Sequence, residues 1–336
     1  MDPHIPLGSL LVRAMLIVNP FATSTTEAGR DALVGTLTAS LRRPGDHRTP
    51  FVEITVEHTT HRGHAGELAS KARLEGYDVV VVHGGDGSVN EVVNGVIDPP
   101  GSAQSSGLPS PAVAVVPGGS ANVFARALGI DPDPLKATGQ LVDLLAGGAR
   151  RRVSLGHTDD RWFLFNAGLG LDAQVVKSID EQRVAGHRAS ATRYLWTAVR
   201  TFIGAAGGQP TLTVTLPDAE PVDGVHYLFV SNSRPWTYLG ARPIETNPDT
   251  SFDGQLGVFA SRSMSPLRNL PLARQLLSRT AQPSARHLLR ADDVPSVVVS
   301  STAPIDMQMD GEYLGTRTAL TFGCRPGALE VVAPPE

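Results

Sequence analysis

Over the first 150 residues, segments with the apolar pattern of a strand alternate with segments whose apolar residues recur at helical spacing. Short apolar or alternating segments predict strands at residues 14–19, 51–57, 77–82 and 112–116. Helical spacing predicts helices at residues 25–41, 63–74 and 88–96, and from about residue 122. Strands that alternate with helices are typical of an α/β domain, a doubly wound parallel sheet covered on both faces. Ligands of such sheets bind at loops after the carboxyl ends of the strands.

The pattern changes after residue 150. Short strands are predicted at residues 152–155, 162–166, 211–216, 226–231, 256–260, 297–301, 305–309, 319–322 and 329–332. Helices are predicted to interrupt them at about residues 189–203 and 266–279. We therefore expect two domains, an α/β domain over residues 1–150 and a β-sandwich over residues 151–336.

Composition narrows the class of protein. The chain has 336 residues, one cysteine (Cys324) and a formal net charge of −4. A single cysteine excludes an internal disulfide and suits a reducing cytosol. A mildly acidic chain lacks the basic footprint of nucleic-acid-binding proteins. No apolar stretch reaches the ~18 residues of a membrane span, and residues 1–13 lack the pattern of a signal peptide. We expect a cytoplasmic protein that does not bind nucleic acid.

The most informative segment is a glycine-rich loop between a predicted strand and a predicted helix. Its residues are Gly84, Gly85, Asp86 and Gly87. Glycines permit close backbone approach and positive φ, and the helix that follows offers unpaired N–H groups to an anion. Ser88 would cap that helix or donate to a phosphate oxygen. Asp86 would repel phosphate, which favours Mg²⁺ coordination or acceptance of a proton from a substrate hydroxyl.

A second loop repeats this arrangement after strand 112–116. Gly118 and Gly119 open it, Ser120 offers a hydroxyl, and Asn122 would cap the next helix. A strand-to-helix turn without a ligand would explain either loop alone. Two such loops on one sheet favour a shared nucleotide site.

Four motifs occur in the order seen in diacylglycerol kinase catalytic domains. They are VNP at residues 18–20, GGDGS with NEVVNG at 84–95, PGGSANVFARAL at 117–128 and DGE at 310–312. The chain therefore resembles the soluble bacterial branch of the diacylglycerol kinase and sphingosine kinase superfamily over nearly its whole length. The resemblance implies a lipid kinase that uses ATP and Mg²⁺ and binds ATP between two domains.

The resemblance also implies which residues hold the nucleotide. The loop of Asn19, Pro20, Phe21, Ala22 and Thr23 would lie beside it, and Thr59 would contact it. Phosphates would be held by Gly84, Gly85, Asp86, Gly87, Ser88, Val89 and Asn90, and by Gly119, Ser120 and Asn122. Glu91 would assist from its helix. Val123 departs from the family, which often has Asp at that position.

The catalytic carboxylates are expected in the second domain. Asp310-Gly311-Glu312 follows an alternating strand, and on composition alone it predicts a hairpin turn. The resemblance makes it a catalytic site in which Asp310 and Glu312 approach the transferred phosphate and one of them acts as general base. We favour Glu312 over Asp310, and Asp86 is a third candidate.

Residues 245–259 resemble the family's structural Mg²⁺ segment. Asp253 would ligate through its side chain, with the carbonyl groups of Thr250 and Gln255 beside it. A plain Asp-Gly turn explains the same residues equally well. Asn166 and Asp172 lie in another segment that matches the family, where they would hold the substrate head or the domain junction.

Two basic stretches bear on membrane contact. Residues 193–204 combine arginines with Leu195, Trp196, Val199 and Phe202, which suits a helix at an anionic lipid interface. A helix packed on the β domain is the alternative. A second stretch is typical of solvated surface and contains Arg268, Arg274, Arg279, Arg286 and Arg290.

Together these features predict a kinase that phosphorylates a lipid hydroxyl at a membrane surface. Diacylglycerol is the first candidate, giving phosphatidic acid, and a sphingoid base, ceramide or another glycerolipid follows. An NAD kinase, which shares the Gly-Gly-Asp-Gly loop, and a catalytically silent nucleotide- or lipid-binding module are the alternatives. Peripheral membrane association and a homodimer go with this interpretation.

Overall fold

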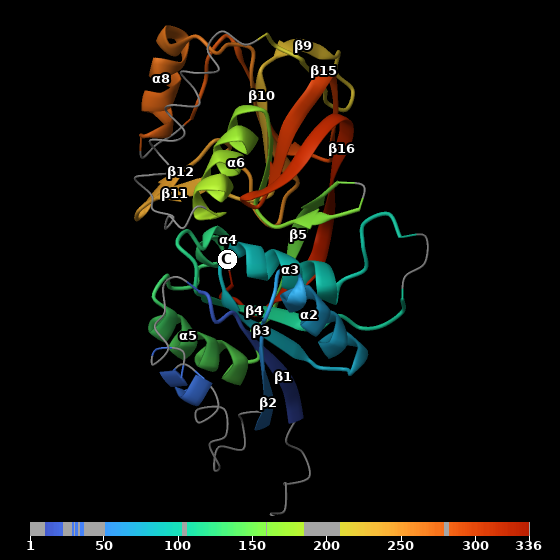
Figure 1. Cartoon of the computed structure of the whole chain (residues 1–336), viewed down its shortest axis with the longest axis vertical. Coiled ribbons are helices and arrows are strands. Elements are labelled where there is room, and N and C mark those ends of the chain that lie inside the picture. The colour runs from blue at the N-terminus through green and yellow to red at the C-terminus, as the bar shows by residue number, and fades with distance from the viewer. Residues whose placement is uncertain are drawn as a thin grey trace, which may run out of the picture. The chain divides into compact units, whose positions relative to one another are not determined.

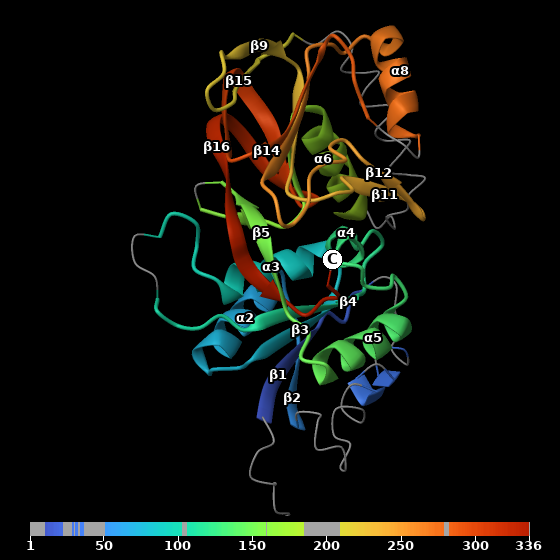
Figure 2. The same ribbon diagram turned by 180° about the vertical axis from the view of Figure 1, so that it is seen from behind.

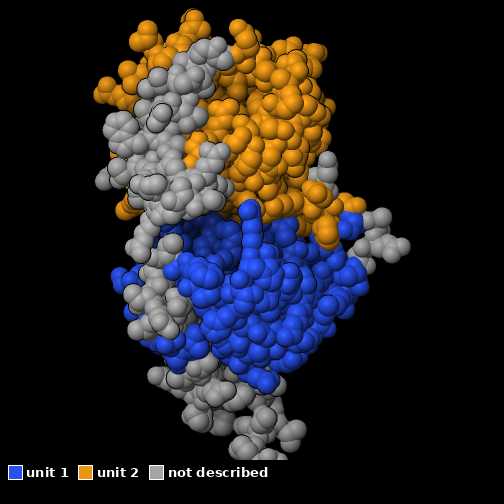
Figure 3. All heavy atoms as spheres, in the orientation of Figure 1, with its two compact units in different colours: residues 1–98, 102–153, 329–336 blue, residues 99–101, 154–328 orange. Residues whose placement is uncertain are grey.

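The computed structural model describes residues 11–22, 29, 31–32, 34–36, 51–102, 106–158, 160–184, 209–278 and 282–335. The chain divides into two compact units, coloured blue and orange in Figure 3. Unit 1 holds residues 1–98, 102–153 and 329–336, and unit 2 holds residues 99–101 and 154–328. Thr23, most of the predicted helix 25–41 and the basic segment 193–204 fall outside the described residues.

Unit 1 contains a parallel sheet in the order β16–β4–β3–β1–β2 (Figure 1). The strands are β1 (Leu11–Val18), β2 (Phe51–His58), β3 (Val79–Gly84), β4 (Ala112–Pro117) and the end of β16 (Glu312–Val331). Every residue of β3 and β4 is buried, as expected for strands covered on both faces. The last strand joins through Val331, which is paired with Val113.

Helices cover both faces of this sheet. They are α2 (His64–Leu74), α3 (Asp86–Val96), the short α4 (Val123–Ala127) and α5 (Pro134–Ala146). α2 and α3 pack against each other on one side, and α5 packs against β4 on the other (Figures 1 and 2). This arrangement confirms the predicted doubly wound α/β fold.

Unit 2 is rich in antiparallel strands. They include β5 (Arg151–His157), which begins in unit 1, β6 (Trp162–Phe163), β7 (Asn166–Leu169), β8 (Leu212–Thr215), β9 (Val222–Val225), β10 (Tyr227–Ser231), β11 (Thr237–Leu239), β12 (Arg242–Ile244), β13 (Leu256–Ser261), β14 (Leu288–Val294) and β15 (Ser296–Met309). The main sheet runs β14–β13–β10–β7–β15–β16. The predicted strands 297–301 and 305–309 form the single strand β15, whose first half pairs with β8 and whose second half pairs with β7.

The sheet of unit 2 has two apolar faces, because successive side chains of a strand point to opposite sides. Leu228 and Val230 of β10 join a large core with residues of β7, β8, β13, β15 and β16. Tyr227 and Phe229 face the other way and pack with Leu272 of α8 (Pro266–Leu276). Another helix among the described residues of this unit is α6 (Leu171–Val184). These features are consistent with the predicted β-sandwich.

Among the residues that the structure describes, no helix combines the length and the apolar character needed to cross a bilayer.

Candidate active site

The two glycine loops pack directly against each other in unit 1. The amide N–H of Gly118 donates to the carbonyl of Gly84 at 2.8 Å. A Cβ atom on Gly119 would lie 2.7 Å from the Cα of Gly85, closer than side chains tolerate. The glycines are therefore required for close backbone approach. Positive φ was expected to be open to Gly84, Gly85 and Gly87, but none of the three has positive φ.

Asp86 joins the two loops. Its Oδ2 accepts from the N–H of Val123 at 3.1 Å, and its Oδ1 accepts from the N–H of Phe124 at 3.2 Å. These are the first two N–H groups of α4, so a carboxylate from one loop caps the helix of the other. The negative charge also lies at the positive end of that helix. The sequence suggested Mg²⁺ coordination or proton transfer for Asp86, and this capping contact was not anticipated.

Asn122 and Ser88 act differently from the predicted helix caps. Asn122 stands at the N-cap of α4 with φ of 49°, but its amide bonds back to the N–H and C=O of Gly119. Ser88 lies inside the first turn of α3, because that helix begins at Asp86 with Gly85 as its N-cap. The Ser88 hydroxyl accepts from Asn19 Nδ2 at 3.0 Å, which ties the loop after β1 to the loop after β3.

The start of α3 is the part of this cluster that suits an anion. Its N-cap residue is Gly85, which supplies no side-chain cap to the N–H groups of the first turn. Gly87 and Ser120 are exposed, and Phe21 keeps 77% of its surface accessible. Val89 and Asn90, in contrast, are buried in α3. Any contact of Val89 with a nucleotide would therefore pass through its backbone.

Thr59 lies at the carboxyl edge of the same sheet. Its N–H donates to the carbonyl of Val18, and its side chain is buried. The following turn is held by Glu91, whose Oε1 accepts from the N–H of Gly63 at 2.9 Å. The structure thus gathers Asn19, Thr59 and both glycine loops at one sheet edge, as the alternation of strands and helices predicts.

Asp310 lies in unit 2 and is almost fully buried. Its carboxylate accepts from three consecutive backbone N–H groups, those of Leu164, Phe165 and Asn166, at 2.7–3.2 Å. Asp310 and Gly311 both have positive φ and form the turn between β15 and β16. The hairpin interpretation of this motif is therefore correct for the backbone.

Glu312 begins β16 immediately after that turn. Arg161 Nη2 lies 2.5 Å from its Oε2, and about a quarter of each side chain is exposed. Of the two carboxylates in the motif, Glu312 is the one with accessible surface, while the oxygens of Asp310 accept from backbone N–H groups. Arg161 was not identified from the sequence, because it stands 151 residues from its partner.

A buried polar network supports the turn of Asp310. Gln308 Nε2 donates to Asn166 Oδ1 and to Asp172 Oδ2, and Gln308 Oε1 accepts from the N–H of Gly311. Asn166 and Asp172 were candidates for substrate or junction contacts, and the structure brings them together through Gln308. Gln308 could not be singled out beforehand, because its only sequence signal is its place in an alternating strand.

The predicted Mg²⁺ segment presents oxygen donors. Asp253 is exposed, and the hydroxyl of Thr250 donates to Asp292 Oδ1 at 2.9 Å. Two buried amide oxygens in the segment, Asn247 Oδ1 and Gln255 Oε1, have no hydrogen-bond partner. Hard oxygen donors of this kind fit Mg²⁺. Within the described ranges, no cluster of three or more His, Cys, Asp or Glu side chains has the arrangement of a metal site.

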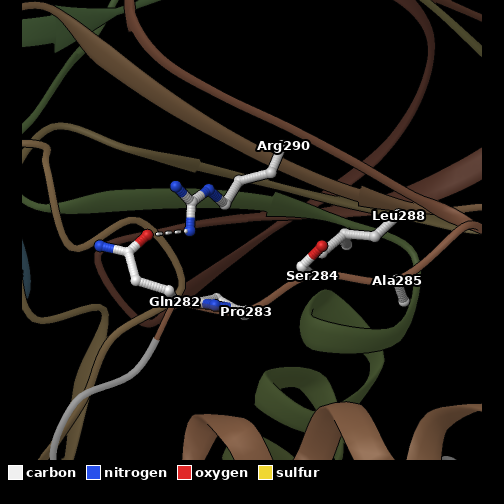
Figure 4. A pocket seen from close by; sticks show the side chains of 6 residues that line it. All are labelled: Gln282, Pro283, Ser284, Ala285, Leu288 and Arg290. Carbon is white, nitrogen blue, oxygen red and sulfur yellow. Dashed lines mark hydrogen bonds between the residues drawn. The ribbon is translucent and has the colours of Figure 1, made fainter.

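A hollow of about 310 Å³ in unit 2 contains none of the residues predicted to bind nucleotide or Mg²⁺ or to act in catalysis (Figure 4). It is lined by Gln282, Pro283, Ser284, Ala285, Leu288 and Arg290. The guanidinium of Arg290 is held there by Gln282, and it also pairs with Asp249 and Asp292. Its charge is thereby balanced inside the protein, so this hollow lacks an unpaired cation for an anionic ligand.

Comparison with known proteins agrees with the order of the motifs. A protein of Pseudomonas syringae pv. tomato named as a YegS-like lipid kinase is 29% identical over 326 residues, covering 96% of this chain and 93% of that protein. A diacylglycerol kinase of Bacillus subtilis is 33% identical over 159 residues, which are 47% of this chain and 46% of that protein.

The fold has a solved counterpart. A crystal structure of a Bacillus anthracis protein described as a diacylglycerol kinase superposes with a TM-score of 0.70 and 21% identity, covering 96% of this chain and 97% of that chain. At this identity the likeness concerns the fold alone. Residues 13–157, which include both glycine loops, match the family model of the diacylglycerol kinase catalytic domain.

Proposed function

We propose that this protein is an ATP-dependent lipid kinase that transfers the γ-phosphoryl group of ATP to a lipid hydroxyl. Diacylglycerol is the first candidate acceptor, with phosphatidic acid as product, and sphingoid bases and ceramide come next. The observation that carries the proposal is the packing of two glycine loops at one sheet edge, within the segment that matches the diacylglycerol kinase catalytic domain. We place the reaction at the cytoplasmic surface of a membrane.

In the proposed reaction the glycine loops hold the nucleotide. Phosphate oxygens would accept from first-turn N–H groups of α3 and from Ser88 and Ser120. The contact of Asp86 with Val123 and Phe124 keeps the two loops in register. Phosphoryl transfer depends mainly on positioning and charge neutralisation, which is what two fixed backbone loops can provide.

The lipid hydroxyl attacks the γ-phosphorus and the bond to the β–γ bridging oxygen breaks, so ADP leaves. The hydroxyl proton must pass to a base, and we assign that role to Glu312. Its partial exposure supports the assignment, and its ion pair with Arg161 fixes its orientation. Asp310 is assigned a positioning role, because its oxygens accept from three backbone N–H groups.

Mg²⁺ belongs to the proposal at two places. Bound with ATP, it would neutralise charge on the phosphates. A structural ion would be held by Asp253 with the carbonyl groups of Thr250 and Gln255, and the unpartnered oxygens of Asn247 and Gln255 support an oxygen-ligated cation in this segment.

The test is a transfer assay with purified protein, labelled ATP and Mg²⁺. Diacylglycerol, ceramide and sphingosine are offered in mixed micelles, and NAD is offered in solution. We expect label in a lipid, most in diacylglycerol. Label in NAD would overturn the lipid assignment, and label in no acceptor from folded protein would indicate a binding module.

Two variants connect the activity to the assigned base. Glu312→Gln should remove transfer while ATP binding is retained. Glu220→Gln is the matched control, since Glu220 is exposed in the turn between β8 and β9 of the same unit. Equal activity of both variants would remove Glu312 from the mechanism.

A further inference from the structure

Helix α8 presents leucines to solvent along one side. Leu267 is 85% exposed, Leu270 68% and Leu277, directly after the helix, 45%. Their spacings of three and seven residues place them on one face, since an α-helix turns by roughly 100° per residue. A single exposed leucine is ordinary, but three on one face of this helix and its C-cap form an apolar stripe that no described part of the chain covers.

The opposite side of α8 is firmly attached to unit 2. Leu272 packs with Tyr227, Phe229 and Phe259 in the smaller apolar cluster. Asn269 is buried and donates to the carbonyl groups of Ser263 and Ser265. The exposed leucines therefore do not result from a detached helix. In both views α8 lies at the outer edge of unit 2 (Figures 1 and 2).

The charge around this stripe has one sign. Six arginines and no Asp or Glu lie between Asp253 and Asp292 in the sequence. Arg268 and Arg274 are exposed on α8 itself, and Arg286 is exposed in the loop that packs against it. This loop is joined to α8 by Gln275, which bonds to the N–H and C=O of Ser284.

These arginines differ from Arg290 in their pairing. Arg290 is balanced by Asp249 and Asp292, whereas Arg268, Arg274 and Arg286 form no ion pair with any described residue. Leucines beside arginines that lack an ion pair with any described residue suit the surface of an anionic bilayer. The leucines suit its apolar chains, and the arginines suit the charged headgroups above them.

A second copy of the chain fits this face less well. A two-fold dimer brings the same patch of both copies together. Arg268 and Arg274 of one copy would then approach the same arginines of the other, with no acidic residue of the stretch to separate them.

We propose that the leucine face of α8 (Leu267, Leu270 and Leu277), flanked by Arg268, Arg274 and Arg286, docks this protein on anionic phospholipid surfaces. The leucines enter the boundary between headgroups and acyl chains, and the arginines contact lipid phosphates. This inference rests on the proposed function in one respect, because a lipid acceptor resides in a bilayer. It assigns the membrane contact to α8, which the sequence alone assigned to solvated surface.

The experiment measures binding of the full chain to vesicles, without ATP. Vesicles of phosphatidylcholine alone are compared with vesicles that also contain phosphatidylglycerol, by co-sedimentation. We expect preferential binding to the anionic vesicles. Arg268→Gln with Arg274→Gln should weaken binding roughly 25-fold, at roughly fivefold for each arginine. Leu267→Ser with Leu270→Ser should weaken it by roughly tenfold or more.

The matched control is Leu135→Ser with Lys136→Gln, which removes an exposed leucine and a cation from α5 of unit 1 and should leave binding unchanged. A second measurement tests whether α8 itself contacts the membrane. The variant Leu270→Cys is labelled with a thiol-reactive, environment-sensitive dye. The dye reacts at position 270 and not at Cys324, because burial raises the pKa of the Cys324 thiol to about 11 and keeps it unreactive. We expect the dye emission to shift to the blue on anionic vesicles.

Equal binding to both vesicle types, or unchanged binding of the leucine variant, would overturn the docking proposal. So would a leucine variant that turns a dimer into a monomer in sedimentation and still binds vesicles. Phosphorylation of a short-chain, water-dispersed diacylglycerol separates this proposal from the proposed function. If neither that lipid nor a short-chain ceramide or sphingosine is phosphorylated while vesicle binding follows the expected pattern, the kinase assignment fails and the docking surface stands.

Discussion

The carboxylate of Asp86 caps a helix that begins 37 residues later, with its Oδ2 3.1 Å from the backbone nitrogen of Val123. Asp86 was a candidate for Mg²⁺ coordination or proton transfer, and its carboxylate also holds the two glycine loops together. Loss of activity on replacing Asp86 therefore has two explanations, which a pair of variants can separate.

Asp86→Ala removes both cap contacts and should lower the free energy of unfolding by about 1–2 kcal/mol. Asp86→Asn keeps an oxygen acceptor for one N–H and should cost less than half as much. Urea unfolding measures the stability of both, and ATP affinity measures the state of the loops. If Asp86→Asn recovers ATP binding but not transfer, the negative charge itself is needed. Recovery of both would assign Asp86 to loop positioning alone.

The close approach of the two loops predicts a strong effect of one methyl group. Gly119→Ala would place a Cβ 2.7 Å from the Cα of Gly85 and should force the loops apart. We expect a loss of about 1–3 kcal/mol in stability and at least tenfold weaker ATP binding by calorimetry.

The control for that variant is Gly139→Ala in α5. Nothing lies within 4 Å of a Cβ at this exposed helical position, so alanine should stabilise the protein by roughly 0.5–1 kcal/mol. Its ATP affinity should equal that of the unmodified protein. If Gly119→Ala behaves like Gly139→Ala, the contact between the loops is not needed for nucleotide binding.

Amide replacement should destabilise the protein much more at Asp310 than at Glu312, the two carboxylates of the turn between β15 and β16. Asp310→Asn would set an NH₂ group against one of three buried N–H donors and should cost about 2–3 kcal/mol of stability. Glu312→Gln loses only a partly exposed ion pair and should cost less than about 1 kcal/mol. Thermal unfolding checks both values. A large loss for Glu312→Gln and none for Asp310→Asn would contradict the assigned roles.

The carboxylate of Asp98 should stabilise unit 1 at neutral pH and lose this effect in acid. The hydrogen bond from Arg73, reinforced by Ser106, lowers the pKa of Asp98 from 3.8 to about 2. Because the pKa of Asp98 is lowered in the folded protein, its contribution to the free energy of unfolding is complete above about pH 4. That contribution is lost as the pH falls through 2. Asp98→Asn should therefore cost about 1–2 kcal/mol at pH 7 and progressively less in acid. Urea titrations of both proteins at several pH values measure this difference, and a constant difference across that range would contradict it.

The sheet of unit 1 could be predicted because each buried strand is recognisable from its own residues. A strand buried on both faces is apolar at every position, and residues 77–82 and 112–116 read that way. Helix α5 was missed, although Asp133 followed by Pro134 is a strong start signal and its side chain caps the helix. Helix α6 was missed because its mixed polarity gives little periodicity.

The identity of the loop residues could be predicted, but their partners could not. Asp86 and Asp310 stood out as acids beside glycines, which is typical both of catalysis and of turns. Their hydrogen bonds join positions 37 and more than 140 residues apart. Contacts of that range depend on how the strands assemble, and one sequence carries no local pattern for them.

The pairing of Val331 with Val113 makes the final strand part of unit 1. Leu329, Val331, Val332 and Ala333 are almost completely buried, and the N–H of Val332 donates to the carbonyl of Val113. These residues follow unit 2 in the sequence, so during synthesis the edge of β4 stays uncovered until residues 154–328 have been made. The nascent unit 1 is consequently open to aggregation and proteolysis until its final strand has been made. Removal of residues 329–336 should therefore destabilise unit 1 more than unit 2.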